Sequence, residues 1–317
     1  MPLDNTTLPL VDPELRPVLD AFKGFDVRPE TLPMLRNIPT PPALNAPSFK
    51  EVFIARDDSE EGLRLLIIKP NVKPLKQGLP ALLYMHGGGF VFGSPEVILP
   101  IMQRLSEDIG CVIILPAYRL APEFPFPAAL NDNYRALTWM HEQAKELGID
   151  SARIAIGGDS AGGGHAAVLS VAARDRGEFS PICQYLIYPM LDDRTGSLNL
   201  PAANTGEFIW TPENNVFGWS AYLGCAAGSR DVPEGSVPAR QKELSGLPPT
   251  LIATGSLDLF AQENMQYSNR LAEQDVSVQS KVFDGAYHGF DVILPEAKIS
   301  RAFYQFCAQG LKTAFKA

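Results

Sequence analysis

The chain has 317 residues, 45% of them hydrophobic, and a formal net charge of −9 at pH 7. Such a length and composition suit one large α/β domain with a modest addition. The negative charge argues against nucleic acid or an acidic membrane surface as a partner. No apolar run approaches the roughly 20 residues that span a bilayer, and the first residues lack the basic-then-apolar pattern of a signal peptide. We therefore expect a cytoplasmic protein without a membrane partner.

The cysteines give no sign of a disulfide framework or of a metal site. The chain has four of them, and they are widely scattered without paired or metal-ligand spacing. Cys111 and Cys183 open strand-like runs, so we expect them to be small core residues. The simplest prediction is a protein that needs no metal and no cofactor.

Strand and helix patterns alternate along most of the chain. The alternation predicts a mostly parallel sheet with helices on both faces and functional loops at the carboxyl ends of the strands. The first two strand candidates are expected to be antiparallel. The eight strand candidates are 51–55, 63–69, 81–85, 111–118, 153–156, 184–188, 250–253 and 276–282. Helix candidates between them include 131–147, 161–174 and 262–273.

Two segments interrupt this alternation. Residues 1–47 are proline-rich and contain one amphipathic piece at 12–22, whereas residues 193–245 are rich in glycine, proline and aromatic residues. Each could be a surface arm or a long loop, but long insertions over an active site are more often lids. We therefore predict a catalytic domain made of 48–192 and 246–317, with 1–47 and 193–245 as additions to it.

A short glycine-rich turn provides the strongest functional signal. Gly158-Asp-Ser-Ala-Gly162 lies between a strand candidate and a helix candidate. A serine in such a turn has its hydroxyl pushed clear of the backbone, next to helix N–H groups that face an incoming oxyanion. Ser160 is therefore the predicted nucleophile. We expect Asp159 to accept hydrogen bonds from nearby backbone N–H groups rather than to take part in catalysis.

A second glycine loop, His86-Gly-Gly-Gly-Phe90, follows the strand candidate 81–85. Successive glycines can adopt conformations closed to other residues, so several N–H groups can be directed into one space. Such donors stabilise the alkoxide of a tetrahedral intermediate. A flexible loop would be the ordinary interpretation of three glycines, but the serine turn favours an oxyanion hole.

The choice of a general base is narrow because the chain has only four histidines. His86 belongs to the glycine loop, and His141 lies midway along an amphipathic helix candidate. His165 lies on the helix that follows Ser160 and points along it, so it cannot reach back over the hydroxyl. His288 lies in a glycine-flanked loop after a strand candidate, where a mobile imidazole is expected. His288 is the predicted base.

The acid should lie at the carboxyl end of a strand between the serine and the histidine, where it can orient the imidazole. Asp258 follows the strand candidate 250–253 and a glycine turn, and it is the predicted acid. The Asp192/Asp193 pair is the alternative, because it also follows a strand-like run. Asp284 lies only four residues before His288, so we expect it to cap a turn.

Four residue groups resemble the hormone-sensitive-lipase-like branch of the α/β-hydrolases, which includes the bacterial family IV esterases. The resemblance covers roughly residues 45 to 315, and the Tyr118–Glu123 stretch is its most diagnostic part because general hydrolase chemistry does not require it. One departure is that Leu-Phe-Ala-Gln follows Asp258, where the family usually has Pro-Leu-x-Asp. The groups are His86-Gly-Gly-Gly-Phe90, Tyr118-Arg-Leu-Ala-Pro-Glu123 with Phe126-Pro-Ala-Ala129, Gly158-Asp-Ser-Ala-Gly-Gly163, and the pair Asp258 and His288.

The resemblance implies an α/β-hydrolase fold, with a mostly parallel eight-stranded sheet and a helical cap that 1–47 and 193–245 form above Ser160. It assigns the oxyanion hole to the N–H groups of Gly88, Gly89 and Ala161, with Gly87 serving the turn. A set of aromatic residues is predicted to bind substrate, although packing within the cap is an equal alternative for each cap aromatic. This set is Phe90, Phe208, Trp210, Phe217 and Trp219.

The expected function is a serine carboxylesterase that hydrolyses short- to medium-chain esters through an acyl-enzyme. Alternatives are an amidase or deacetylase with the same triad, and a non-catalytic small-molecule receptor on the same fold. A homodimer is conceivable through the last strand and an apolar stripe of the C-terminal helix, although such stripes more often pack on their own sheet. The stripe comprises Ile299, Phe303, Cys307 and Leu311.

Overall fold

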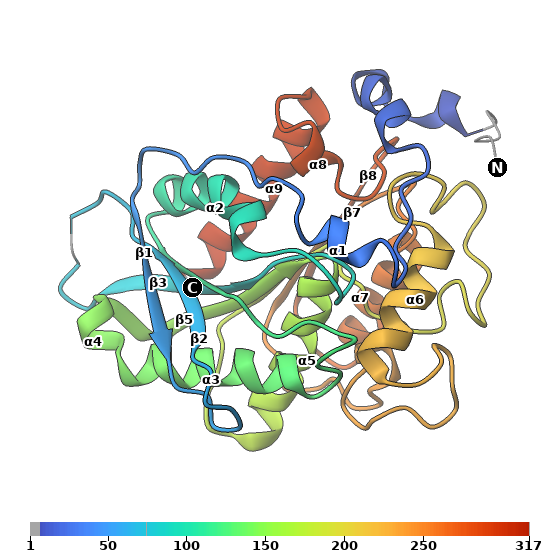
Figure 1. The fold of residues 1–317 in the computed structure, drawn as a ribbon. Coiled ribbons are helices and arrows are strands. Elements are labelled where there is room, and N and C mark those ends of the chain that lie inside the picture. The colour runs from blue at the N-terminus through green and yellow to red at the C-terminus, as the bar shows by residue number, and fades with distance from the viewer. Residues whose placement is uncertain (1–6, 74, 317) are drawn as a thin grey trace.

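A twisted eight-stranded sheet runs through the centre of the molecule in the computed structural model, which describes residues 7–73 and 75–316 (Figure 1). The strand order is β1-β2-β4-β3-β5-β6-β7-β8; β2 is antiparallel to β1 and β4, and every other neighbouring pair is parallel. The predicted mostly parallel sheet is confirmed. The strands are β1 (Phe49–Ile54), β2 (Leu63–Ile68), β3 (Leu79–Met85), β4 (Val112–Pro116), β5 (Ile149–Asp159), β6 (Gln184–Ile187), β7 (Thr250–Gly255) and β8 (Val278–Phe283).

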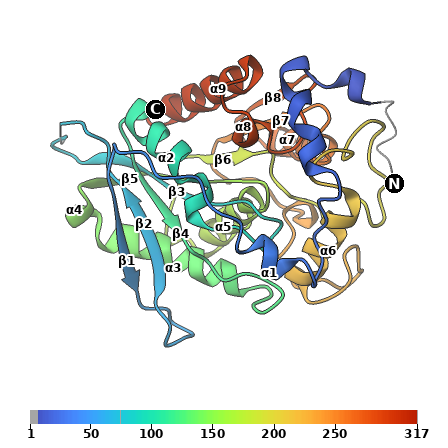
Figure 2. The same ribbon diagram turned by 45° about the horizontal axis from the view of Figure 1, so that its top comes forward.

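Helices cover both faces of this sheet (Figure 2). On one face α2 (Pro95–Ile109) and α9 (Lys298–Ala314) contact each other and the strands. On the other face lie α3 (Ala128–Glu142), α5 (Ala161–Arg176) and α7 (Ala261–Glu273). The shorter helices are α1 (Leu32–Leu35), α4 (Ala144–Leu147), α6 (Pro212–Leu223) and α8 (Phe290–Ile293), with 3-10 helices at Leu8–Leu10, Pro13–Phe22 and Pro238–Arg240. Within the described ranges, no helix has the length and apolar character needed to cross a bilayer.

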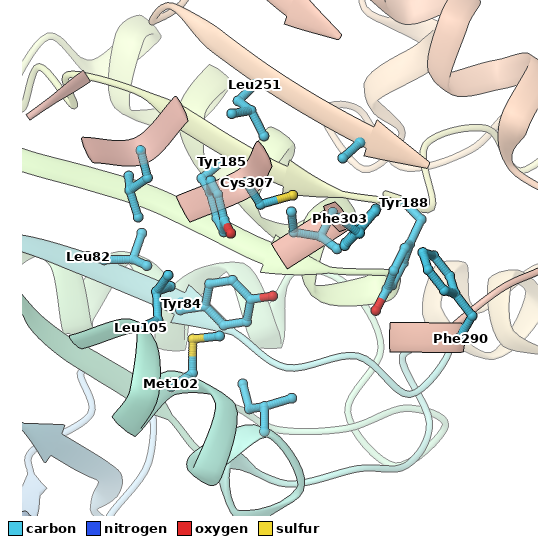
Figure 3. Packing of buried hydrophobic residues seen from close by; sticks show 14 of the residues in the cluster. Leu82, Tyr84, Met102, Leu105, Tyr185, Tyr188, Leu251, Phe290, Phe303 and Cys307 are labelled. Atoms are coloured by element: carbon cyan, nitrogen blue, oxygen red, sulfur yellow. The ribbon is translucent and has the colours of Figure 1, made fainter. Parts of the chain in front are cut away.

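The buried strands feed two cores because successive side chains point to opposite faces of a sheet. On β3, Leu82 and Tyr84 belong to the core under α2 and α9, whereas Leu83 belongs to the core under α3 and α5. Figure 3 shows part of the first core, where Phe303 and Cys307 of α9 pack over the sheet. The apolar stripe of α9 therefore packs on its own sheet, and the homodimer stays a prediction.

A third core joins the two segments that interrupt the strand-helix alternation. Val27, Leu32 and Leu35 of the N-terminal segment pack in one cluster with aromatic residues of the 193–245 segment. The backbone N–H of Val27 also donates to Asn214 Oδ1 at 2.9 Å. The boundaries of the two segments stay predictions, but apolar contacts of this kind hold them together.

Candidate active site

The serine turn is a tight bend between β5 and α5. Ser160 has φ 54° and ψ −122°, a strained backbone conformation for a residue other than glycine. A Cβ atom on Gly162 would lie 2.1 Å from the carbonyl oxygen of Met85, and one on Gly158 would lie 2.3 Å from the backbone of Gly162. Only glycine fits at these two positions, so the close approach of β3, β5 and α5 fixes the place of the Ser160 hydroxyl.

The structure brings Ser160, His288 and Asp258 into one hydrogen-bonded chain. His288 Nε2 lies 2.9 Å from Ser160 Oγ, and His288 Nδ1 lies 2.8 Å from Asp258 Oδ2. The other carboxylate oxygen of Asp258 accepts the backbone N–H of Phe260 at 2.9 Å. All three side chains are buried. A neutral imidazole that donates from Nδ1 to the carboxylate can accept the serine proton at Nε2.

The alternative acids lie elsewhere and have other partners. Asp192 pairs with the Arg194 guanidinium at 2.8 Å, and Asp193 pairs with Arg240 at 2.6 Å. Asp284 is exposed and accepts a hydrogen bond from the Ser256 hydroxyl. None of the three contacts the imidazole.

The glycine loop lies opposite the serine turn. Gly88 and Gly89 have φ 123° and 56°, and a Cβ atom on Gly88 would lie 2.0 Å from the carbonyl oxygen of Phe92. The Tyr118 hydroxyl fixes the start of the loop, because it donates to the His86 carbonyl at 2.6 Å while its ring stacks on the imidazole. Within the described part of the chain, the N–H groups of Gly88, Gly89 and Ala161 donate to no acceptor. Free donors of this kind can hold an oxyanion.

An apolar pocket of about 310 Å³ opens above Ser160. Its floor comprises 87–89 of the glycine loop, Asp159, Ser160 and His288. Its roof and walls come largely from segments that are distant from Ser160 in the sequence. Most of the lining side chains are aromatic or aliphatic. The apolar contributors are Phe22, Phe25, Leu35, Ile38, Pro39, Pro41, Phe92, Val97, Ile98, Ile209, Trp210, Val292 and Ile293.

Comparisons with known proteins agree with this arrangement. A family model described as alpha/beta hydrolase fold matches residues 82–292. The chain belongs to this family. Esterase LipI of Mycobacterium tuberculosis is 33% identical over 297 residues, which cover 91% of each chain. An arylesterase of Saccharolobus solfataricus is 31% identical over 269 residues, 84% of each chain. The solved structure of a bacterial heroin esterase has a TM-score of 0.84 and 32% identity, covering 98% of this chain and 100% of that one.

The family and the fold thus agree with the resemblance, but the predicted pocket residues need correction. Of the five aromatics expected to bind substrate, Trp210 alone lines the pocket. Phe90 and Trp219 are fully buried against each other, with ring centroids 4.9 Å apart. Phe208 packs on Tyr287 in the core under α9, and Phe217 packs on the third core. Phe217 and Trp219 thus pack within the cap, which is the alternative for the cap aromatics, whereas Phe208 packs in the core under α9 and Phe90 packs on the cap from the glycine loop.

The pocket also has residues that the sequence did not single out. Tyr188, which follows β6, packs its ring edge-on against His288 at a centroid distance of 4.9 Å. Phe22 and Phe25 come from the N-terminal segment, and Val292 and Ile293 come from α8. The amphipathic pattern at 12–22 gave a signal for Phe22, but no local pattern shows which apolar residue will face a distant serine.

Asp159 differs from its predicted role. The sequence predicts that its carboxyl accepts hydrogen bonds from nearby backbone N–H groups. In the structure Asp159 Oδ1 is buried without a hydrogen-bond partner among the described residues, and the carboxyl lies against Gly87. Burial, aided by the nearby charge of Asp291, raises the pKa of Asp159 to about 7. Within residues 7–73 and 75–316 there is no cluster of three or more side chains that could hold a metal ion.

Proposed function

We propose that this chain is a carboxylesterase that hydrolyses short- to medium-chain carboxylic esters through an acyl-enzyme on Ser160. The observation that carries the proposal is the hydrogen-bonded chain from Ser160 through His288 to Asp258 at the floor of an apolar pocket. Its support from the comparisons is that relatives covering most of the chain are named esterases.

In the first step Ser160 Oγ attacks the ester carbonyl carbon while His288 Nε2 takes its proton. The carbonyl π electrons move to oxygen, and the N–H groups of Gly88, Gly89 and Ala161 stabilise the resulting oxyanion. Asp258 stabilises the imidazolium and keeps the imidazole in its productive orientation. The oxyanion then re-forms the carbonyl, the ester C–O bond breaks, and His288 gives its proton to the leaving alcohol.

In the second step water replaces the alcohol. His288 takes a proton from the water as it attacks the acyl carbon, and the same N–H groups hold the second oxyanion. Collapse of this intermediate breaks the bond to Ser160 Oγ, which receives the proton back from His288. The carboxylic acid leaves and the free enzyme is regenerated.

The pocket indicates the class of substrate. A volume of about 310 Å³ lies at the low end of small-molecule sites, which span roughly 300–1,000 Å³. Its lining is mostly apolar, so it favours a short or medium acyl chain on a simple or aromatic alcohol. The cytoplasmic location stays a prediction.

Hydrolysis of p-nitrophenyl esters from acetate to palmitate, run beside Ser160→Ala, tests the proposal. We expect a maximum at short or middle chain lengths and a loss of about 10⁴-fold or more in the variant. No turnover by folded wild-type protein would contradict ester hydrolysis. Turnover of p-nitroanilides alone would then indicate an amidase, and failure of an organophosphonate probe to label Ser160 would indicate a receptor.

A further inference from the structure

A second group of ionisable side chains lies beside His288, and the triad does not use it. Tyr188 connects this group to the histidine: its ring packs against the imidazole, and its hydroxyl donates to Asp291 Oδ1 at 2.9 Å. Asp159, next to Ser160 in the chain, faces the same region. Figure 3 shows Tyr84 and Tyr188 among the buried side chains of the first core.

Asp159 is buried and Asp291 is half-buried. Three further aspartates are buried away from the triad, and each of them pairs with arginine. Asp132 pairs with two arginines, and Asp192 and Asp193 pair with one each. Such pairing is the rule, because an unpaired buried charge is costly. Among the described residues, Asp159 and Asp291 have no ion pair with lysine or arginine, and the positive group that acts on both is His288.

The surroundings of Asp159 and Asp291 raise the pKa values of both carboxyls, so both change charge near neutral pH. Burial raises the pKa of Asp159 to about 7 and that of Asp291 to about 6. The ionisable groups facing this pair come from several elements. They are Tyr84 on β3, Tyr185 on β6, Tyr188 after β6, His288 in the loop after β8, and Cys307 on α9. The tyrosines and the cysteine have a raised pKa and stay neutral, so the titrating charges of this group are those of the two aspartates.

We infer that Asp159 and Asp291 form an accessory acidic pair that stabilises the imidazolium of His288 during acyl transfer, with Tyr188 holding Asp291 in place. This inference rests on the proposed function. His288 becomes positive when it takes the proton of Ser160, and a negative charge nearby is stabilising only at that stage. Asp258 supplies one such charge through a direct hydrogen bond, and the accessory pair supplies a further charge through space. Both aspartates act through His288 and not on the ester.

The sign of the pH dependence follows from the raised pKa values. Both carboxyls are neutral below about pH 6 and become charged as the pH rises through about 7. The pair therefore contributes above neutrality and loses its contribution as the pH falls from about 7 through about 6. As the pH falls, wild-type kcat/KM should decrease with the uptake of more than one proton. The slope of log kcat/KM against pH should therefore exceed 1.

The test compares Asp291→Asn with Asp284→Asn. Asparagine keeps the oxygen that accepts the Tyr188 hydroxyl but removes the charge. Asp284→Asn removes the same charge from an exposed position in the same segment. For Asp291→Asn we expect plateau kcat/KM to fall about fivefold and the acid slope to approach 1. For Asp284→Asn we expect the wild-type slope and plateau.

A titration in the inactive Ser160→Ala background reads the pair without turnover. Carbon NMR of labelled aspartates should show two carboxyls that titrate between about pH 6 and 7. In Ser160→Ala/Asp291→Asn, the Asp159 signal should move to lower pH, because its neighbour's charge is gone. The inference would be overturned if the Asp159 and Asp291 carboxyls both titrated below pH 5. It would also be overturned if kcat/KM depended on pH in the same way in Asp291→Asn and Asp284→Asn. A wild-type protein without Ser160-dependent hydrolysis would instead overturn the proposed function.

Discussion

Backbone geometry holds the floor of the Ser160 pocket, whereas side-chain packing holds its roof. The floor consists of 87–89, Ser160 and His288, and its glycines have carbonyl oxygens or fixed side chains where a Cβ would be. The roof consists of Phe22, Phe25, 35–36, 38–41, Ile209 and Trp210, and most of these residues are at least partly exposed. The two regions meet where the Trp210 ring lies against Gly89, at the place a Cβ atom would occupy.

This difference separates the chemistry of the pocket from its selectivity. Parallel strands place the floor residues, so a small change there moves reacting atoms. Apolar contacts place the roof residues, so a change there alters the space available to the acyl or alcohol group. Substitutions in the floor should therefore lower kcat for every ester, while substitutions in the roof should change the ranking of esters.

The largest expected effect comes from Gly88→Ala in the floor. The new Cβ would meet the Phe92 carbonyl at 2.0 Å, so the loop must shift and its N–H groups leave the oxyanion. We expect kcat to fall by roughly 10²–10³-fold for short and long esters alike. Gly148→Ala is the control, since Gly148 has φ 71° but open space around it. A normal kcat in Gly88→Ala would contradict the assignment of the oxyanion hole.

An intermediate effect is expected from Trp210→Ala in the roof. Removing the indole enlarges the pocket, and each methylene that becomes buried contributes about 0.8 kcal/mol. The ratio of kcat/KM for p-nitrophenyl hexanoate over acetate should rise about tenfold, which corresponds to two methylenes. Phe217→Ala, outside the pocket lining, should leave this ratio within about twofold. Equal shifts in both variants would remove the distinction between lining and packing aromatics.

The smallest expected effect comes from Arg36→Ala, which removes the hydrogen bonds that attach part of the roof to the rest of the protein. The Arg36 guanidinium donates to the carbonyls of Val91 and Ala121 at 2.9 Å and to both carboxylate oxygens of Glu123. We expect KM to rise roughly threefold with little change in kcat. Arg28→Ala, which removes only an exposed pair with Asp26, should leave KM unchanged. A lowered kcat with unchanged KM would contradict this prediction and would show that Arg36 supports the floor of the pocket.

The same variant predicts a pH effect on stability. The Arg36 guanidinium lowers the pKa of Glu123 to about 2. A lowered carboxyl pKa stabilises the folded state above the unfolded-state value, about 4.3 for glutamate, and the contribution is lost as the pH falls towards 2. Acid unfolding followed by circular dichroism should therefore be less steep between about pH 4 and 2 in Arg36→Ala. An unchanged acid transition would show that this surface pair contributes no measurable stability.

Much of the fold and of the candidate site could be predicted because the signals are local. The alternation of short apolar runs with amphipathic stretches predicted all eight strands, and glycine turns marked where Ser160 and the glycine loop at 86–90 lie. Choosing His288 among four histidines needed only the position of each one along its element. The aromatic pocket residues could not be chosen in this way. Phe217 and Trp219 look alike in the sequence to Trp210, yet packing turns them away from the pocket.

The sequence by itself determined the family and the sheet and identified Ser160, His288 and Asp258 as candidates for one site, because strand periodicity and glycine turns are encoded in a few neighbouring residues. Tertiary structure alone decided what surrounds those residues. It brought Phe22 and Phe25 over Ser160, placed Tyr188 on His288 and, among the described residues, left Asp159 and Asp291 without an arginine partner. The physical reason is that desolvation and packing depend on every element that approaches a side chain, and most of those elements lie far away in the chain.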